Sequence, residues 1–553
     1  MDAVNEPMAD VSDVAVDPPV PAVPAETPLP VPAEKLATCL EVLGVLANDL
    51  TVIEQPTMRT FRKVIAPVAD YMESRKFSGK GRKKYLEDKE LRREKEARQL
   101  KRKMNDNKHI NSATLRRARV EKLNELLEQG KDMLPMIADG AVEEAPALLE
   151  DGSKAPVVEL EKQRSCYTCK KRYEQLHHFY DQLCPVCAEL NYTKRMQSAD
   201  LRGRVALVTG ARVKIGFQTA LKLLLAGATV IATSRFPHDT AERYAAHPDF
   251  ATFQDRLHIY GIDFRDMVHL EQFLDFVQTK YDRLDMLIHN ACQTIRRPPS
   301  YYSHMMPKET TPVAALPASV QPLLRQQTDF HAELLRAGAP ALTADGGGAV
   351  PPVLANLSAV KTQIPMLIED GANAESFPDG LKDVNGQQLD LRTTNSWVLK
   401  MGQVSTPEVA EVFAINTLAP FIMNSRLRAL MERTPAQDKY IINVSAMEGK
   451  FYRYKTPNHP HTNMAKAALN MMTRTCAEEL SKHGIYMNSV DTGWINDENP
   501  LEKAHKYAKA ANFQTPIDEV DAAARIVDPI FVGVNEAKFT FGLFYKDYHE
   551  TEW

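Results

Sequence analysis

Four cysteines in two CxxC pairs carry the clearest metal-binding pattern of the sequence. The first pair is Cys166 and Cys169, and the second, fourteen residues further on, is Cys184 and Cys187. Each CxxC turn directs two thiolates to one point, and four thiolates are a common ligand set for a tetrahedral structural zinc ion. Four protein ligands leave no position for a substrate, so we expect the site to stabilise a small module. His177 and His178 lie between the pairs, where a histidine could replace a cysteine or pack at the surface.

A glycine turn, Thr209 to Gly216, is the second pattern that can do chemistry. The apolar run before it predicts a buried strand, a helical pattern follows from Ile215, and a second apolar run ends at Arg235. Gly210 permits a tight turn and Gly216 lets the helix approach the sheet, while free N–H groups at the helix start can bind a pyrophosphate. The pattern predicts a nucleotide-binding strand–turn–helix–strand unit.

This turn and several later segments resemble the short-chain dehydrogenases/reductases. The turn is similar to the family's TGxxxGxG sequence, and His289-Asn290-Ala291-Cys292 is similar to its NNAG element. Asp263 matches the aspartate near the adenine ring, and Asp491-Thr492-Gly493-Trp494 lies where the family has its PG turn. The resemblance covers about residues 200–295 and 401–550, and it implies an α/β fold with a doubly wound parallel sheet of Rossmann type. The cofactor contacts that it implies are Thr209, Gly210, Arg212, Lys214, Ile215, Gly216, Arg235, Asp263, Asn290, Ala291, Lys466, Thr492 and Gly493.

Only half of the catalytic set of this family is present. Asn416 matches the helix asparagine, but the strand that carries the catalytic serine has Ala446 at that position. The family's YxxxK helix aligns with residues 461–469, which places Thr462 at the tyrosine and Lys466 at the lysine. The resemblance implies a tyrosine as general acid/base, and a threonine hydroxyl is far too weak an acid to replace a phenol near neutral pH.

Another side chain could take over the proton transfer. Tyr452 and Tyr454 lie between the strand and the helix, in a segment slightly longer than is usual in the family, and His461 adjoins Thr462. Ser445 would reach the site if its register differed by one residue. The alternative is that these aromatic residues fill the emptied pocket. The candidate catalytic residues are Asn416, Ser445, Tyr452, Tyr454 and Lys466.

Two arginines favour NADP(H) over NAD(H). A family member that uses NAD would have an aspartate at the end of the second strand, whereas this sequence has Arg235 there and Arg212 in the turn. Guanidinium groups suit a 2′-phosphate. Lys214 adds positive charge and replaces the middle glycine of the turn, so we expect a loop of different shape. The alternative is that Arg235 and Lys214 form surface ion pairs.

The elements that position these residues alternate along the second half of the chain. The predicted strands are 204–209, 228–234, 257–261, 285–290, 438–445, 484–490 and 538–544. An insertion at 296–400 leaves the sheet at the carboxyl end of a strand, the edge where such sheets bind ligands. We therefore expect either a cap over the cleft or an inert loop. Its Ala/Gly/Pro-rich part, 337–352, is expected to be disordered, and 389–397 to be ordered.

The N-terminal part of the chain predicts a different organisation. We expect a disordered acidic Pro-rich tail (1–34), a helical region with a basic arm (35–137), an acidic linker (138–158), the zinc module (159–199) and the α/β domain (200–553). Residues 75–122 hold 19 Lys or Arg against 7 Asp or Glu, a net charge of 19 − 7 = +12. This segment predicts either a protein or RNA partner or a solvated helix.

The composition of the 553 residues limits the remaining classes. A net charge of −4 gives no general sign of nucleic-acid or membrane binding, and no apolar run is long enough to span a membrane. The acidic N-terminus does not resemble a signal peptide, so a cytoplasmic location is expected. We predict an NADP(H)-dependent oxidoreductase with a displaced acid/base that acts on a small-molecule substrate. The protein is also a candidate homo-oligomer. The alternative is a catalytically inactive NADP(H)-binding scaffold or RNA-associated factor that acts through the zinc module and the basic arm.

Overall fold

The computed structural model describes residues 31–76, 81–129, 158–336, 358–367, 370, 374–383, 386–451 and 454–553. It divides the chain into two compact units, Met1–Leu100 and Lys101–Trp553. The first unit contains α1 (Ala33–Asn48) and α2 (Arg59–Lys76), and the helix α3 (Arg82–Ser112) has residues in both units. The expected tail lies outside the described residues except for its last four positions, and the expected linker lies outside them except for Val158.

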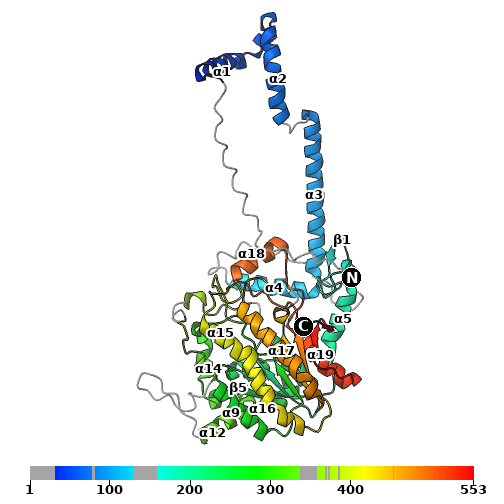
Figure 1. Cartoon of the computed structure of the whole chain (residues 1–553), viewed down its shortest axis with the longest axis vertical. Helices are drawn as coiled ribbons and strands as arrows, with labels where there is room; N and C mark the ends of the chain where they lie inside the picture. Colours follow the sequence, from blue (N-terminus) through cyan, green and yellow to red (C-terminus); the bar gives the residue numbers. More distant parts are fainter. Residues whose placement is uncertain are drawn as a thin grey trace, which may run out of the picture. The chain divides into compact units, whose positions relative to one another are not determined.

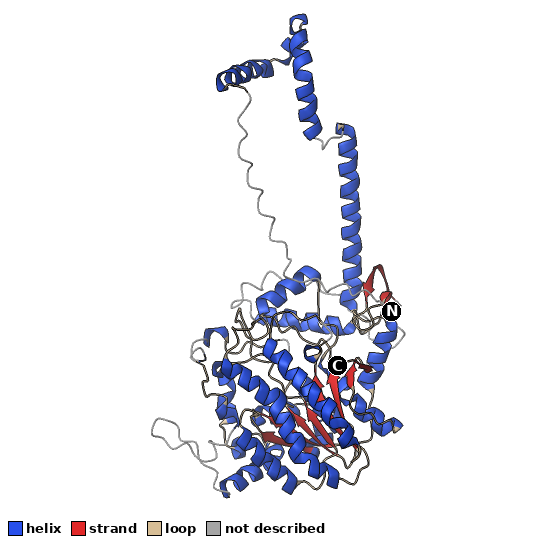
Figure 2. Cartoon of the chain, viewed as in Figure 1, coloured by secondary structure: helices blue, strands red, loops and turns tan. Residues whose placement is uncertain are grey.

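An eight-stranded sheet forms the centre of the second unit (Figure 2). Its order is β10-β9-β8-β7-β6-β3-β4-β5, and all neighbours are parallel except the pair of β9 and β10. The strands are β3 (Val205–Thr209), β4 (Thr229–Ser234), β5 (Leu257–Gly261), β6 (Met286–His289), β7 (Lys439–Ser445), β8 (Ile485–Asp491), β9 (Phe544–Lys546) and β10 (His549–Thr551). The prediction of a doubly wound parallel sheet is confirmed.

The last predicted strand was placed too early in the sequence. The structure puts β9 at Phe544–Lys546 rather than at 538–544. Ala537 and Gly542 both have positive φ, and the Gly542 N–H donates to the Met487 carbonyl at 2.8 Å. The apolar residues between them therefore belong to a turn that leads the chain back to the sheet.

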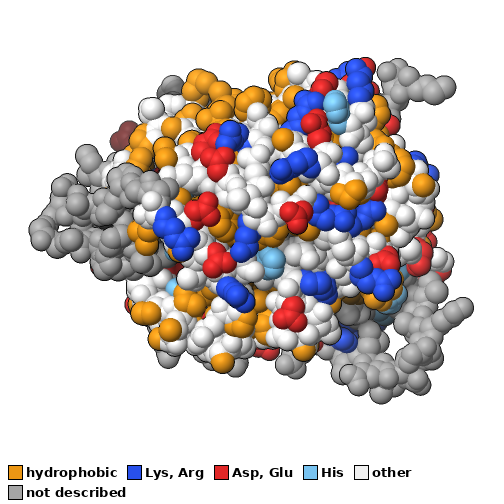
Figure 3. All heavy atoms as spheres, turned by 90° about the horizontal axis from the view of Figure 1, so that it is seen from below, with side chains coloured by type: hydrophobic (Ala, Val, Ile, Leu, Met, Phe, Trp, Pro, Cys, Tyr) orange, Lys and Arg blue, Asp and Glu red, His pale blue; other side chains and the backbone are white. Residues whose placement is uncertain are grey.

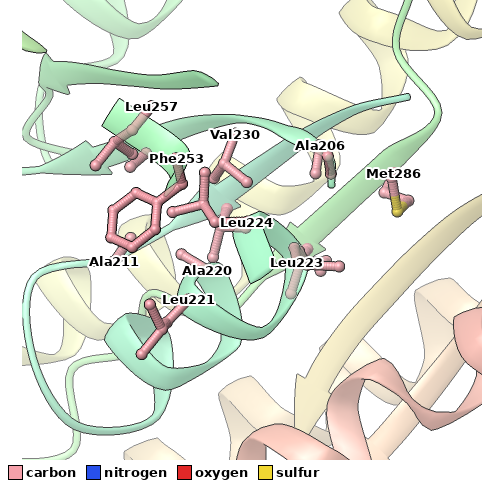
Figure 4. Packing of buried hydrophobic residues seen from close by; sticks show 14 of the residues in the cluster. Ala206, Ala211, Ala220, Leu221, Leu223, Leu224, Val230, Phe253, Leu257 and Met286 are labelled. Carbon is pink, nitrogen blue, oxygen red and sulfur yellow. The ribbon is translucent and has the colours of Figure 1, made fainter. Parts of the chain in front are cut away.

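Helices cover both faces of the sheet (Figure 1). α6, α7 and α19 pack on one face, and α9, α16 and α17 pack on the other. Leu223 and Leu224 of α6 are fully buried against Val230 of β4 and Ala206 of β3 (Figure 4). The helices are α6 (Lys214–Leu225), α7 (Pro237–Ala245), α8 (Phe250–Phe253), α9 (Met267–Lys280), α15 (Thr406–Phe413), α16 (Ala419–Arg433), α17 (Pro460–Ser481), α18 (Leu501–Ala511) and α19 (Glu519–Glu536).

The first half of the insertion packs on the carboxyl edge of β4 and β5. It contains α10 (Pro299–Tyr302), α11 (Met306–Glu309), α12 (Arg325–Arg336) and α14 (Ser358–Lys361). The Ser358 hydroxyl donates to the Arg235 carbonyl at 2.7 Å, and the Gly261 N–H donates to the Gln327 side chain at 2.8 Å. These buried contacts pack this part of the insertion against the sheet edge, and its role as a cap or an inert loop stays a prediction. Residues 337–352 lie outside the described part, and 389–397 form an irregular segment.

The surface of the second unit is mixed in charge on the face seen in Figure 3, where the described acidic and basic side chains are interspersed. Within the described ranges, no helix combines the length and the apolar character needed to cross a membrane.

Glu309 attaches the insertion to the start of α7. Its buried carboxylate accepts hydrogen bonds from the N–H groups of His238, at 3.1 Å, and Asp239, at 2.8 Å. Burial raises the pKa of Glu309 to about 7, because the two N–H groups only partly offset the loss of solvation. The folded state therefore holds a proton on Glu309 in a pH range where the unfolded chain does not.

The free energy of unfolding should fall as pH rises through this range. A carboxyl whose folded pKa exceeds its unfolded value stabilises the fold fully below the unfolded pKa, and that contribution is lost as pH approaches 7. The loss attributable to Glu309 is about 3 kcal/mol between pH 4.5 and 8. Chemical unfolding at several pH values should show a flatter profile for Glu309→Gln than for the wild type. Parallel profiles would contradict this prediction.

Candidate functional site

The glycine turn after β3 brings three backbone segments into close contact. A Cβ atom on Gly216 would lie 2.1 Å from the Gly210 carbonyl oxygen and 2.4 Å from Asn290 Nδ2. Gly210 has φ +67°, and a Cβ there would lie 2.9 Å from the Cα of Ala291. Both glycines are therefore required, because any side chain would separate α6 from the sheet.

The loop after β6 holds this turn in place. Asn290 Nδ2 donates to the carbonyls of Thr209 and Gly210 at 3.0 and 3.2 Å. The Ala291 N–H donates to Thr209 Oγ1 at 2.9 Å. The structure thus brings together six of the predicted cofactor residues: Thr209, Gly210, Ile215, Gly216, Asn290 and Ala291.

Lys214 begins α6 with φ +50°, in the left-handed region that glycine favours. The lysine therefore keeps the backbone conformation suited to the family's middle glycine, with strain of about 1 kcal/mol. Lys214 therefore does not require the different loop shape that the sequence predicted. Among the described side chains, none pairs with its ammonium group, so the charge is available to an anion at the turn.

Arg212 and Arg235 both lie next to Phe236, just after β4, near the position where family members that use NAD have an aspartate. Their guanidinium carbons are 5.4 and 5.6 Å from the centre of the Phe236 ring. Arg235 donates to the Tyr302 hydroxyl at 2.7 Å, and Arg212 pairs with Asp239 at 2.9 Å. Burial raises the pKa of Asp239, but the charges of its arginine partners outweigh burial and bring it to about 2. Both guanidinium groups are thus held at the end of β4 by packed side chains.

Three more of the predicted cofactor residues lie at the carboxyl ends of neighbouring strands. Asp263 is buried after β5, and its carboxylate binds the Arg265 guanidinium at 2.6 Å. Thr492 and Gly493 follow β8, where Gly493 has φ +82° and its N–H donates to Asp491 Oδ1 at 2.8 Å.

At two of the four catalytic positions of the family, Asn416 and Lys466, the side chain is bound within the protein. Asn416 lies on a π-helical turn, Ala414–Leu418, and its Oδ1 accepts from the Gln293 N–H at 2.8 Å. Lys466 Nζ donates to the Val444 carbonyl at 2.7 Å. The Thr462 hydroxyl is buried and makes no hydrogen bond to any described residue.

Two of the predicted replacements are not brought to this position. Tyr454 is 90% exposed, so the expectation that its phenol fills the vacant place is corrected: the chain before α17 turns this side chain to solvent. Ser445 donates to Asn470 Oδ1 at 2.6 Å, and this buried contact directs it to α17. Tyr452 lies outside the described residues.

A buried polar network that the sequence did not reveal connects Asn416 to the start of α17. Gln293 Nε2 donates to Glu411 at 3.0 Å, Arg296 Nε lies 3.2 Å from the same carboxylate, and the Arg296 N–H donates to Ser396 at 2.8 Å. On α15, one turn before Glu411, Glu408 Oε1 lies 3.4 Å from His461 Nε2.

The electrostatics of Glu408 keep it ionised. Burial raises its pKa, but contacts with His461 and Ser396 outweigh burial and lower the pKa below its usual value. In the sequence, Ser405-x-x-Glu408 has the pattern of a helix cap, and Ser405 does cap α15. The contact of Glu408 with His461 of α17 depends on the tertiary fold.

The four predicted zinc ligands form one cluster. The first pair follows β1 (Val158–Ser165) and precedes β2 (Arg172–Leu176), and the second pair is at the start of α5 (Pro185–Met196). All four sulfur atoms lie within 4.8 Å of one another, and those of Cys169 and Cys184 are 3.7 Å apart. Sulfurs bound to one tetrahedral zinc ion are about 3.8 Å apart. The donor set and the spacing both fit zinc, and His177 Nδ1 instead accepts from the Phe179 N–H.

This cysteine module is attached to the α/β domain by buried polar contacts. The Tyr167 hydroxyl, between the first two cysteines, accepts from the Trp494 N–H at 2.8 Å. Tyr180 donates to Asp521 of α19 at 2.6 Å, and Arg195 pairs with Asp518 at 2.6 Å. The module thus reaches the turn after β8 directly.

Comparisons with known proteins agree with this geometry. The short chain dehydrogenase family matches residues 204–312, and the family described as Enoyl-(Acyl carrier protein) reductase matches residues 394–530. An uncharacterized protein of Acanthamoeba polyphaga mimivirus is 31% identical over 397 residues, which are 70% of this chain and 75% of that protein. A fatty acyl-CoA reductase of Acinetobacter baylyi is 33% identical over 98 residues, 18% of this chain and 32% of that protein.

Among solved structures, a short chain dehydrogenase from Burkholderia cenocepacia in complex with NADP is 17% identical, with a TM-score of 0.38 over 62% of this chain and 96% of that chain. The chain belongs to the short-chain dehydrogenase/reductase family, a family of oxidoreductases, and is a divergent member of it. The unmatched residues 313–393 fall within the predicted insertion.

Gly216→Ala should disrupt the turn. The added methyl group would overlap the Gly210 carbonyl and Asn290, so we expect a loss of roughly 2–3 kcal/mol in the free energy of unfolding and loss of dinucleotide binding. Thermal unfolding and NADPH fluorescence measure both effects. Gly44→Ala, in α1 with open space around it, is the matched control. Unchanged NADPH affinity in Gly216→Ala would contradict the assignment of the turn.

Proposed function

We propose that this protein is an NADP(H)-dependent oxidoreductase with an altered acid/base. The observation that carries this proposal is the glycine turn, whose two close backbone approaches allow only glycine and place the start of α6, where N–H groups can bind a pyrophosphate, against the sheet. Arg235 and Arg212, placed around Phe236, favour a cofactor with a 2′-phosphate. The Acinetobacter relative bears the name of a fatty acyl-CoA reductase, which supports a carbonyl compound as the substrate class.

We assign the role of general acid, which donates a proton to the substrate, to His461. Its ring is buried beside Thr462, where the family has its tyrosine, and imidazole is the side chain best suited to proton transfer near neutral pH. Glu408, 3.4 Å away, would stabilise the charged imidazolium. The network through Arg296 and Gln293 connects this pair to Asn416 and fixes the loop after β6.

The proposed reaction takes a hydride from the cofactor and a proton from His461. When bound, NADPH supplies a hydride to the carbonyl carbon. His461, charged and with its Nε2 facing Glu408, would give its Nδ1 proton to the carbonyl oxygen, so that an alcohol and NADP⁺ are formed. Glu408 holds the imidazole in position, and water returns the proton between turnovers.

One observation favours the alternative of a non-catalytic NADP(H)-binding protein. Lys466 Nζ donates to the Val444 carbonyl, so it is engaged within the protein rather than directed to an open cleft. Under that alternative the cofactor would bind without turnover.

Single variants separate these two functions. Against a panel of aldehydes, His461→Gln should lower NADPH oxidation by about a hundredfold and leave NADPH affinity nearly unchanged. Tyr454→Phe, an exposed control, should retain full turnover. Tight NADPH binding without turnover in the wild type would favour the non-catalytic alternative. Full turnover in His461→Gln would direct attention to Tyr452.

We also propose a structural zinc ion in the cysteine cluster. Its support is the sulfur geometry and the absence, within the described part of the chain, of a disulfide that would use the same residues. For the basic segment 75–122, a protein or RNA partner stays a proposal. Arg116 and Arg119 make contacts inside the second unit, so the charge offered to such a partner belongs mainly to earlier residues.

Metal analysis of the purified chain should find one zinc per molecule. Cys184→Ser should lose the metal and lower the Tm by at least roughly 5 °C, because the binding free energy of a structural zinc contributes directly to folding. Cys39→Ser, an exposed cysteine of α1, is the control and should keep both values. A full zinc content in Cys184→Ser would contradict the assignment.

A further inference from the structure

Tyr167 connects the cysteine module to the turn after β8. This residue lies between Cys166 and Cys169, and its hydroxyl oxygen accepts a hydrogen bond from the Trp494 N–H at 2.8 Å. A Cβ atom on Gly493 would lie 3.4 Å from the same oxygen, so the phenol is in contact with the backbone of the turn. Gly493 has φ +82° and is one of the predicted cofactor contacts. A residue outside the α/β domain thus supports a turn that the cofactor is expected to meet.

The same turn packs against the apolar cluster that surrounds the cysteines. A Cβ atom on Gly493 would lie 2.6 Å from Ile517 Cδ1, and Ile517 is fully buried in that cluster. Ile495, which follows the turn, packs against the cluster as well. Thr515 Oγ1 donates to the Ile495 carbonyl at 3.0 Å. The two ends of the segment 495–517, which contains α18, are therefore joined to each other and to the core of the cysteine module.

The position of Tyr167 depends on both CxxC pairs. Its N–H donates at 2.8 Å to the carbonyl of Gln182, which lies two residues before the second pair. Gln182 Nε2 in turn donates to the Gln514 carbonyl, so the second pair is also connected to the segment after α18. A metal ion held by all four sulfurs would keep the two pairs together and would thereby fix the backbone that carries Tyr167.

Arg116 of α4 (Thr114–Gln129) provides a second connection between the module and this segment. Its Nη1 pairs with Asp181 at 3.1 Å, and both side chains are almost fully buried. Its Nη2 donates to the Asn512 carbonyl at 2.6 Å. This connection does not involve Tyr167, so removal of the Tyr167 hydroxyl should leave the module attached and change only the turn.

We propose that Tyr167 is a positioning residue for the turn at 492–494, and that the closed cysteine cluster raises the affinity for NADP(H) by holding Tyr167 in place. This inference rests on the proposed oxidoreductase function for the identity of the dinucleotide. The support of the turn does not, because it concerns the backbone of residues 492–494 in the unbound protein. Thr492 and Gly493 lie on this turn, and a turn that is already ordered costs less conformational entropy when the cofactor binds.

The first test removes one hydroxyl group from the full chain. Tyr167→Phe keeps the ring but leaves the Trp494 N–H without its acceptor. Amide exchange in a peptide that spans residues 492–498 should accelerate about tenfold, and NADPH should bind about fivefold more weakly. Mass spectrometry and NADPH fluorescence measure the two effects. Tyr192→Phe, in α5 of the same module, is the matched control and should keep the wild-type values of both.

The second test asks whether Tyr167 transmits the effect of the metal. EDTA should weaken NADPH binding about tenfold in the wild type, but only about twofold in Tyr167→Phe, because the contact that links the cluster to the turn is already lost. A merely structural role of the module would weaken binding by the same factor in both proteins. Zinc content, measured before chelation, should be equal in the two.

Wild-type exchange and NADPH affinity in Tyr167→Phe would overturn the positioning role of Tyr167. Equal EDTA factors in the two proteins, or no EDTA effect in the wild type, would overturn its link to the cysteine cluster. A wild type that binds no NADPH would overturn the proposed function instead, and hydrogen exchange at residues 492–498 would still test the support of the turn without any ligand.

Discussion

The close approach of Gly216 to the Gly210 carbonyl and to Asn290 is the constraint on which the rest of the site depends. It sets the distance between the start of α6 and the sheet, and it ties the turn after β3 to the loop after β6. That loop carries Gln293, which binds Asn416 on the π-helical turn. A shift at the glycines would therefore reach the catalytic positions without any change in their own residues.

A second constraint comes from outside the α/β domain. The cysteine module and α4 belong to the same compact unit as the sheet, and their contacts concentrate on two places: the turn after β8, through Tyr167, and the segment after α18, through Arg116 and Arg119. A zinc ion in the module would thus act on the site through packing, with no direct part in the chemistry. This arrangement gives the N-terminal region a role that a solvated basic arm would not have.

Local patterns predicted most of the fold and the position of the glycine turn. Strand β5 was predicted at its observed bounds, and β3, β4, β6, β7 and β8 within one or two residues, because buried parallel strands read as continuous apolar runs. β9 was misplaced, because a turn with positive φ at Ala537 and Gly542 is itself apolar in sequence. Tyr454 and the Glu408–His461 pair could not be judged from spacing, because exposure and contact across α15 and α17 are decided only by the tertiary fold.

A crystal structure of the full chain with NADP⁺ would locate the cofactor relative to these residues. We expect the pyrophosphate at the turn from Gly210 to Gly216, the 2′-phosphate within about 4 Å of the Arg235 guanidinium, and the nicotinamide ring between Asn416 and the His461 ring. A dinucleotide bound elsewhere, or a nicotinamide ring remote from His461, would contradict this expectation.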